Sequence, residues 1–266
     1  MTDAALRQAA AQWLLAGRAA MQVQVLSARG SVPRRPGARM LVAADEVLGT
    51  IGGGHLEWRA IDAARARLVA GQDEASDDAI ALGPTLGQCC GGTLVLRTER
   101  LTPARLAQWR LPAPRFTLQI HGAGHVGRAI VKLLEGIDCR VQWIDEREAE
   151  FPAAASAPHV ERVCVEPVEA EVAAAPPGAF YLVLTHSHDL DLRITEAILR
   201  RGDFGYLGLI GSRSKRARFL HRFEARGIVP AVLARMVCPI GVEGVQGKEP
   251  EVIAVAVVAQ LLQASA

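Results

Sequence analysis

The sequence predicts an α/β protein in two parts, an N-terminal mixed α+β domain followed by a Rossmann-like domain with a parallel sheet. Three observations predict this fold class. Beyond residue 115, strand-like hydrophobic segments alternate regularly with segments of helical periodicity. A glycine-rich turn, GAGHVG, joins the first strand of that series to its first helix. The preceding segment, LTPARLAQWRLPAPRF, is rich in proline, so we place the boundary there and expect domains 1–112 and 113–266.

Composition and charge exclude several classes of protein. Half of the 266 residues are hydrophobic, and 30 basic residues nearly balance 28 acidic ones. No long basic run is present, so we expect no nucleic-acid partner. The N-terminal residues lack the pattern of a secretory signal, and no stretch is apolar for long enough to span a membrane, so we expect a cytoplasmic protein. The five cysteines, an odd number at irregular spacing, do not form a secreted disulfide framework.

The first domain is predicted to mix helices with short strands. Its hydrophobic segments lack the regular strand-helix order of the second domain. Helices are expected at 4–16 and 56–69, and strands at 21–28, 39–44, 46–53 and 93–99. The acidic segment QDEASDD is predicted to form a loop.

A glycine run between a strand and a helix of this domain is the first candidate site. It consists of Gly52, Gly53 and Gly54. Successive N–H groups in such a run can point into one concavity that suits phosphate or another oxyanion. His55 and Glu57 follow in the first turn of the expected helix, and Arg34 upstream is a further donor to an anion. Surface arginines usually have no specific role, so the prediction depends on the glycine run.

Two adjacent cysteines, Cys89 and Cys90, stand between glycines in GQCCGG. Neighbouring Cα atoms lie about 3.8 Å apart, below the roughly 4.4 to 6.8 Å of an unstrained disulfide, so a bridge between them is disfavoured. The two residues either pack as small apolar side chains at a turn, or act as accessible thiols that bind a metal or carry sulfur. The flanking glycines favour the second interpretation, because they mark backbone that bends sharply or approaches another group closely.

The second domain is predicted to form a parallel sheet with helices on both faces, because its strands and helices alternate. Strands are expected at 116–122, 139–145, 161–166, 179–186 and 206–211, and helices at 125–136, 192–201, 215–226 and 251–262.

The turn HGAGHVG matches the G-x-G-x-x-G pattern at Gly122, Gly124 and Gly127. It follows a strand, opens a helix and precedes a second strand that ends in Asp145, which is the sequence context of a dinucleotide site. The glycines would let a phosphate approach the helix N-terminus, and Asp145 would bind a ribose or a similar diol. The alternative is a Rossmann-like scaffold that has lost its nucleotide.

Three further segments are candidates for lining the same cleft. THSHDLD places His186, with a second histidine and two aspartates, at the carboxyl end of a strand, where open α/β sheets bind ligands. These residues either line a polar cleft or hold zinc, although no second histidine-rich element completes a zinc site. Lys215 in GLIGSRSKRARF and Lys248 ahead of the last helix are candidate anion contacts, and either is otherwise a solvated charge.

Taken together and in order, these motifs resemble one family closely, the xanthine dehydrogenase accessory proteins of the XdhC/CoxI group. The motifs span nearly the whole chain: GSVPRRPGARM, GTIGGGHLEW, GQCCGG, HGAGHVGRA, IDEREAEFP, THSHDLD, GLIGSRSKRARF and PIGVEGVQGKEPEVIAVAV. The resemblance implies a chaperone that binds the molybdenum cofactor in its molybdopterin form. Such a protein carries the cofactor during sulfuration with a cysteine desulfurase and inserts it into xanthine dehydrogenase or a related molybdenum hydroxylase.

The resemblance also implies roles for the candidate residues. Cys89 or Cys90 would ligate the molybdenum or hold a transferable persulfide, and the glycine run would bind the phosphate of the pterin. The family does not settle the ligand of the second domain, for which a nucleotide is the hypothesis. We expect a homodimeric binding and insertion protein rather than a turnover enzyme. The alternative is an NAD(P)-dependent oxidoreductase that uses the Rossmann domain, although no obvious proton donor and hydride-acceptor site is present.

Overall fold

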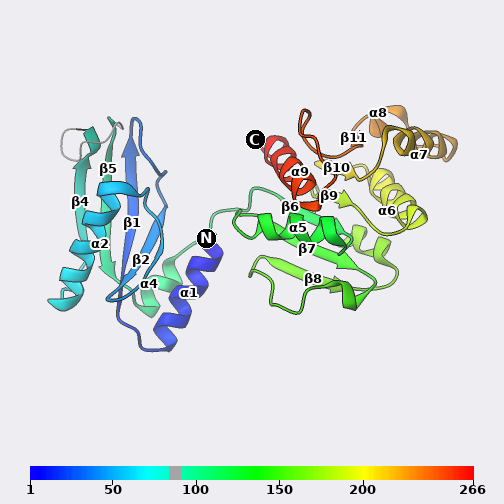
Figure 1. Ribbon diagram of the computed structural model, residues 1–266. Helices are drawn as coiled ribbons and strands as arrows, with labels where there is room; N and C mark the ends of the chain where they lie inside the picture. The colour runs from blue at the N-terminus through cyan, green and yellow to red at the C-terminus, as the bar shows by residue number, and fades with distance from the viewer. Residues whose placement is uncertain (84–90) are drawn as a thin grey trace. The chain divides into compact units, whose positions relative to one another are not determined.

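The computed structural model describes residues 1–83 and 91–266 (Figure 1). The chain divides into two compact units, Met1–Pro112 and Ala113–Ala266, each with its own sheet and its own core. The predicted fold class is confirmed, because the sheet of the first unit is antiparallel and the sheet of the second is parallel. Within the described ranges, no helix combines the length and the apolar character needed to cross a membrane.

The first unit is built on a five-stranded antiparallel sheet in the order β3-β2-β1-β5-β4. The strands are β1 (Ala20–Arg29), β2 (Arg39–Ala43), β3 (Val47–Gly49), β4 (Ser76–Ala81) and β5 (Thr93–Arg100). The edge strand β4 begins inside the acidic segment that was predicted to be a loop, so that prediction is wrong at its end. Asp77 of β4 accepts two hydrogen bonds from Arg97 of β5, at 2.7 and 2.6 Å, and this cross-strand pair supports the polar first half of the strand.

Helices lie on both faces of this sheet. α2 (Gly54–Val69) packs on one face through Leu56, Ala60 and Ala64. α1 (Asp3–Leu15) and α4 (Pro103–Gln108) belong to a second apolar cluster with β2. α4 lies in the proline-rich segment that was predicted to hold the domain boundary; its proline occupies the first helical position, where no N–H donor is needed.

The second unit is built on a six-stranded parallel sheet in the order β11-β10-β9-β6-β7-β8. The strands are β6 (Thr117–His121), β7 (Arg140–Asp145), β8 (Val160–Cys164), β9 (Phe180–Val183), β10 (Tyr206–Leu209) and β11 (Met236–Val237). Within this unit the chain begins at the central strand β6, runs outward through β7 to β8, and returns to the other side of β6 with β9. This is the doubly wound order of Rossmann folds, in which ligands bind beside the carboxyl ends of the two central strands.

Helices cover both faces of the parallel sheet, as predicted. α5 (His125–Leu134) and α9 (Pro250–Ala264) share one apolar cluster, and α6 (His188–Arg201) and α7 (Arg213–Ala225) share the other. Three short elements complete the unit: η1 (Glu148–Glu150), η2 (Val168–Ala174) and α8 (Pro230–Leu233). Because β6, β7 and β9 are parallel neighbours, the loops after them and the first turn of α5 lie at the same edge of the sheet.

Candidate functional site

Two segments of the first unit, the glycine run and the residues after the cysteine pair, pack against the turn at residues 31–34, so three loops meet there. A Cβ atom on Gly52 would lie 2.5 Å from Cγ of Pro33 and 3.7 Å from Cγ of Arg34, so the glycine run packs directly against this turn. A Cβ atom on Gly92 would lie 2.4 Å from the carbonyl oxygen of Ser31, and the Gly92 amide donates a hydrogen bond to that oxygen at 3.1 Å. The turn at 31–34 thus contacts both Gly52 of the glycine run and Gly92, which follows the cysteine pair.

The cysteine pair itself, Cys89 and Cys90, lies outside the described residues, together with the rest of 84–90. The predicted roles of both thiols, including metal ligation by Cys90, therefore stay predictions. The chain on either side of this segment is described, and its two ends are joined by a hydrogen bond of 3.0 Å from the Leu82 amide to the Gly92 carbonyl. Both ends therefore lie beside the turn at 31–34.

At the start of the glycine run, backbone amides converge on a carboxylate of the chain, an arrangement that we call the amide cup. Gly52, Gly53 and Gly54 have φ values of +132°, +75° and +64°, a region that favours glycine. The amides of Ile51 and Gly53 both donate to Oε2 of Glu57, at 3.0 and 3.1 Å. An external oxyanion would reach these two amides only by displacing Glu57. The first turn of α2, which has no side-chain cap, and the exposed Arg34 are the remaining donors.

Sequence reasoning named His55 as a site residue but missed Trp58, which forms an exposed aromatic pair with it beside this cup. The rings of His55 and Trp58 stack with centroids 5.9 Å apart and an interplanar angle of 21°. Trp58 is 63% exposed, whereas Trp13, Trp109 and Trp143 are buried. The helical period could have revealed this position, because the buried residues of α2 recur every four positions and Trp58 falls between them. An exposed large ring next to a polar turn is a surface on which a flat ligand can stack.

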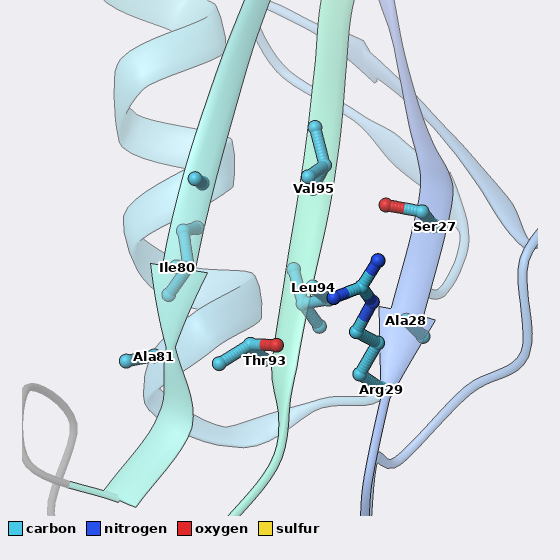
Figure 2. Close-up of a pocket in the computed structure, with 9 residues that line it drawn as sticks. Ser27, Ala28, Arg29, Ile80, Ala81, Thr93, Leu94 and Val95 are labelled. Carbon is cyan, nitrogen blue, oxygen red and sulfur yellow. The ribbon is translucent and has the colours of Figure 1, made fainter.

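An open hollow of about 420 Å³ lies on the sheet of the first unit, over β1, β5 and β4 (Figure 2). Small side chains such as Ser27 and Ala81 leave this space free. The side chain of Arg29 extends along the sheet toward Ser27 (Figure 2). The hydroxyl groups of Ser27 and Thr93 and the guanidinium of Arg29 are hydrogen-bond donors, so the hollow suits a polar or anionic group.

In the second unit, the predicted glycine turn is assembled as its pattern requires. Gly122 has a φ of +127°, and a Cβ atom there would lie 2.4 Å from the carbonyl oxygen of Leu184. A Cβ atom on Gly127 would lie 2.2 Å from the carbonyl oxygen of Gly122, so this glycine permits the close packing of α5 on the turn. A Cβ atom on Gly124 would meet nothing within 4 Å. Gly124 is therefore the position at which a ligand can approach the backbone.

Asp145 is buried at the end of β7 and is saturated by hydrogen bonds. It accepts from the Ala123 amide at 2.7 Å, and from the amide, Nε and Nη2 of Arg147 at 3.0 Å each. Burial would raise the pKa of Asp145, but the hydrogen bonds from Arg147 and Ala123 outweigh it and lower the pKa. A carboxylate offers about four acceptor positions, so Asp145 can bind a ribose, as the sequence predicted, only if Arg147 leaves.

Lys215 has a different role from the predicted one. Its ammonium group is buried and donates to the carboxylate of Asp191 and, at 2.9 Å, to the carbonyl of Ile210. Asp191 is also buried and accepts from the amide and the hydroxyl of Thr185, at 3.0 and 2.7 Å. Lys215 therefore ties the first turn of α6 to the start of α7, and its charge is neutralised by Asp191 instead of being presented to a ligand.

The remaining predicted residues are exposed. His186 lies at the rim of a small pocket, with Nε2 at 3.6 Å from Oε1 of Glu146. Lys248 lies in the exposed loop before α9, and its amide bonds the side chain of Glu249. In residues 1–83 and 91–266, no group of three His, Cys, Asp or Glu side chains is placed to hold a metal ion. The zinc alternative for THSHDLD has no support from these residues.

Comparisons with known proteins agree with both units. The family model described as the XdhC Rossmann domain matches residues 118–261, and the model of the XdhC and CoxI family matches residues 13–76. The chain is 30% identical over 253 residues to the uncharacterized protein YqeB of Escherichia coli (strain K12), which covers 90% of this chain and 42% of YqeB. The chain thus spans less than half the length of that relative.

A solved structure has the same fold as this chain. It is a crystal structure named as a xanthine dehydrogenase from Bacillus halodurans, and it superposes with a TM-score of 0.77 over 99% of this chain and 96% of its own. The two sequences are 19% identical. At that identity the likeness shows a shared fold and nothing more.

Proposed function

Because the chain belongs to the XdhC and CoxI family, we propose that it is an accessory protein of a xanthine dehydrogenase or a related molybdenum hydroxylase. Its cargo is the molybdenum cofactor in the molybdopterin form. The protein holds this cargo while a cysteine desulfurase supplies sulfur, and then inserts it into the partner enzyme. It acts in the cytoplasm as a homodimer.

The meeting of three loops in the first unit is the observation that carries this proposal. A cargo that combines a phosphate with a soft metal centre needs hydrogen-bond donors and thiolates in one place. The turn at 31–34 contacts the glycine run through Gly52 and the residues after the cysteine pair through Gly92. Arg34 supplies a positive charge at the same turn.

The remaining residues of this region suit the other parts of the cargo. The contacts of Glu57 support this, because the amides of Ile51 and Gly53 and the hydroxyl of Thr50 all donate to one oxygen of its carboxylate. The stacked rings of His55 and Trp58 are exposed next to the cup and offer a platform to a flat pterin ring. In this arrangement the phosphate lies at the first turn of α2 beside Arg34, and the thiols of Cys89 or Cys90 take the metal centre.

Equilibrium dialysis with purified molybdenum cofactor under anaerobic conditions tests the role of the thiols. The double variant Cys89→Ser and Cys90→Ser is expected to bind the cofactor about tenfold more weakly than the parent, because serine is a poor ligand for a soft metal. Cys164→Ser is the matched control, since Cys164 is an exposed free cysteine in the second unit. No uptake by the parent, or equal uptake by the double variant, would contradict the proposal.

A glycine pair tests the contact between the loops. Gly52→Ala places a methyl group against the ring of Pro33, whereas Gly17→Ala meets nothing within 4 Å. Both positions have positive φ, +132° at Gly52 and +65° at Gly17, so both variants carry backbone strain, and cofactor retention is compared per mole of folded protein. On that basis we expect Gly52→Ala to retain less cofactor than Gly17→Ala. Equal retention would show that the packing of the glycine run on the turn at 31–34 has no part in binding.

For the second unit we propose a nucleotide ligand at the turn before α5. Gly124→Val fills the open space at which a phosphate approaches the backbone, and it should weaken binding of adenosine monophosphate. Gly136→Val is the matched control, because a Cβ atom at Gly136 also meets nothing within 4 Å and lies beyond the end of α5. Unchanged affinity in the Gly124 variant would remove this site.

A further inference from the structure

A narrow pocket opens at the carboxyl ends of β6, β7 and β9, where the strand order of the second sheet reverses. Its cavity volume is about 10 Å³, which is room for one water molecule or one hydroxyl group. The polar residues that line it are His121, Asp145, Glu146, Thr185 and His186. Ligands of doubly wound folds bind at this position in the sheet.

His121, the last residue of β6, is 1% exposed, and its hydrogen bonds define which ring nitrogen carries the proton. Nε2 lies 3.3 Å from Oε1 of Gln119. The amide nitrogen of Gln119 donates to the carbonyl oxygen of Glu171 at 2.7 Å, and a carbonyl can only accept, so Oε1 of Gln119 must face His121. Nε2 of His121 is therefore protonated, and Nδ1 carries a free lone pair.

That lone pair has no hydrogen-bond partner among the described residues. Burial lowers the pKa of His121 to about 3, so the ring is neutral at physiological pH and Nδ1 remains an acceptor. A buried acceptor without a partner is unfavourable, and native proteins generally supply a water, an ion or a ligand to satisfy it. Nδ1 of His121 therefore requires a donor from outside the described residues.

The other polar groups at this edge define which kind of ligand supplies that donor. Asp145 is saturated by Arg147 and Ala123, so it is not available to a ligand hydroxyl. Glu146, at the rim, lies beside His186. Across the turn, the first turn of α5 begins at Gly124 without a side-chain cap, and its amides favour an anion. The edge thus combines a buried acceptor that admits one hydroxyl group with donors that suit a phosphate.

We propose that Nδ1 of His121 accepts a hydrogen bond from a ribose hydroxyl of a nucleotide whose phosphate lies at the first turn of α5. The inference rests on the nucleotide site proposed for the second unit and specifies how that site recognises ribose. His121 takes the role that the sequence pattern assigns to Asp145, because Arg147 keeps Asp145 occupied.

Calorimetric titration with adenosine monophosphate and its 2′,3′-dideoxy analogue tests this assignment. The parent protein should bind the ribonucleotide about tenfold more tightly, since the dideoxy analogue leaves Nδ1 without its donor. His121→Gln keeps a polar atom near Nε2 but has none at Nδ1, so it should bind both nucleotides equally. His121→Asn places an oxygen near Nδ1 and should restore part of the preference.

Nitrogen NMR of the histidine-labelled parent provides a readout that needs no substitution. Adenosine monophosphate, but not the dideoxy analogue, should shift the signal of the unprotonated ring nitrogen of His121. Equal affinity of the parent for the two nucleotides, or a preference that survives in His121→Gln, would overturn the role of His121 while leaving a nucleotide site in place. Absence of any nucleotide binding would overturn both. Neither result affects the cofactor role of the first unit, which the dialysis experiment tests separately.

Discussion

Acid is expected to destabilise the second unit through His121. The pKa of an unfolded histidine is about 6.5, whereas burial lowers the pKa of His121 in the folded protein to about 3. Between these values the unfolded chain binds a proton that the folded chain does not. The free energy of unfolding therefore falls as the pH falls from about 6.5 toward 3. Each pH unit in this window is worth about 1.4 kcal/mol, which amounts to about 2 kcal/mol between pH 8 and pH 5.

Urea unfolding at pH 8 and pH 5, followed by circular dichroism, measures this contribution when the parent is compared with His121→Gln. All other titrating groups are present in both proteins, so the difference between their pH dependences isolates His121. We expect the parent to lose about 2 kcal/mol more than the variant on going to pH 5. If the two proteins lost the same free energy, His121 would titrate as an exposed histidine does, and the argument for a buried neutral acceptor would fail.

Three further predictions concern packing and exposure. Lys215→Met should lower the free energy of unfolding by about 3–5 kcal/mol, because it leaves Asp191 buried without its partner; the double variant with Asp191→Leu should recover most of this loss in urea unfolding, and a double variant no more stable than the single one would refute the ion-pair argument. Gly127→Ala should lower the melting temperature, because its methyl group would lie 2.2 Å from a backbone oxygen, whereas Gly136→Ala should not; equal melting temperatures would show that the turn adapts. Trp58→Phe should abolish most iodide quenching of the intrinsic fluorescence, since the other tryptophans are buried, and quenching that persists would place another indole in solvent.

The features that could be predicted from the sequence are those set by local pattern. Alternating strands and helices predicted β6 to β10 to within a few residues at each end. The positions of Gly122, Gly124 and Gly127 predicted the turn between β6 and α5. Only glycine tolerates the close backbone contacts at Gly122 and Gly127, and Gly124 leaves open space beside the backbone. Both predictions succeed for the same reason: the constraint lies within a few consecutive residues.

Pairings between side chains could not be predicted in this way. The ion pair of Lys215 with Asp191 joins residues on different helices, and the cup of the first unit is partly filled by Glu57, which a pattern of glycines does not reveal. The unpartnered nitrogen of His121 could not be predicted either, because it depends on the contact of His121 with Gln119 and on the bond from Gln119 to Glu171, which is distant in the sequence.

The edge strand β4 gives the first unit a place where its sheet can be extended by another molecule. Exposed strand edges present unpaired backbone groups, and natural proteins commonly guard them with charge. In β4 the charged residues that oppose such pairing are Asp77, which is also paired with Arg97, and the exposed Asp78. Their carboxylates repel a second acidic edge only while they are ionised. Near neutral pH this repulsion therefore opposes the pairing of β4 with a second β4 edge, whereas strong acid protonates the carboxylates and removes the repulsion.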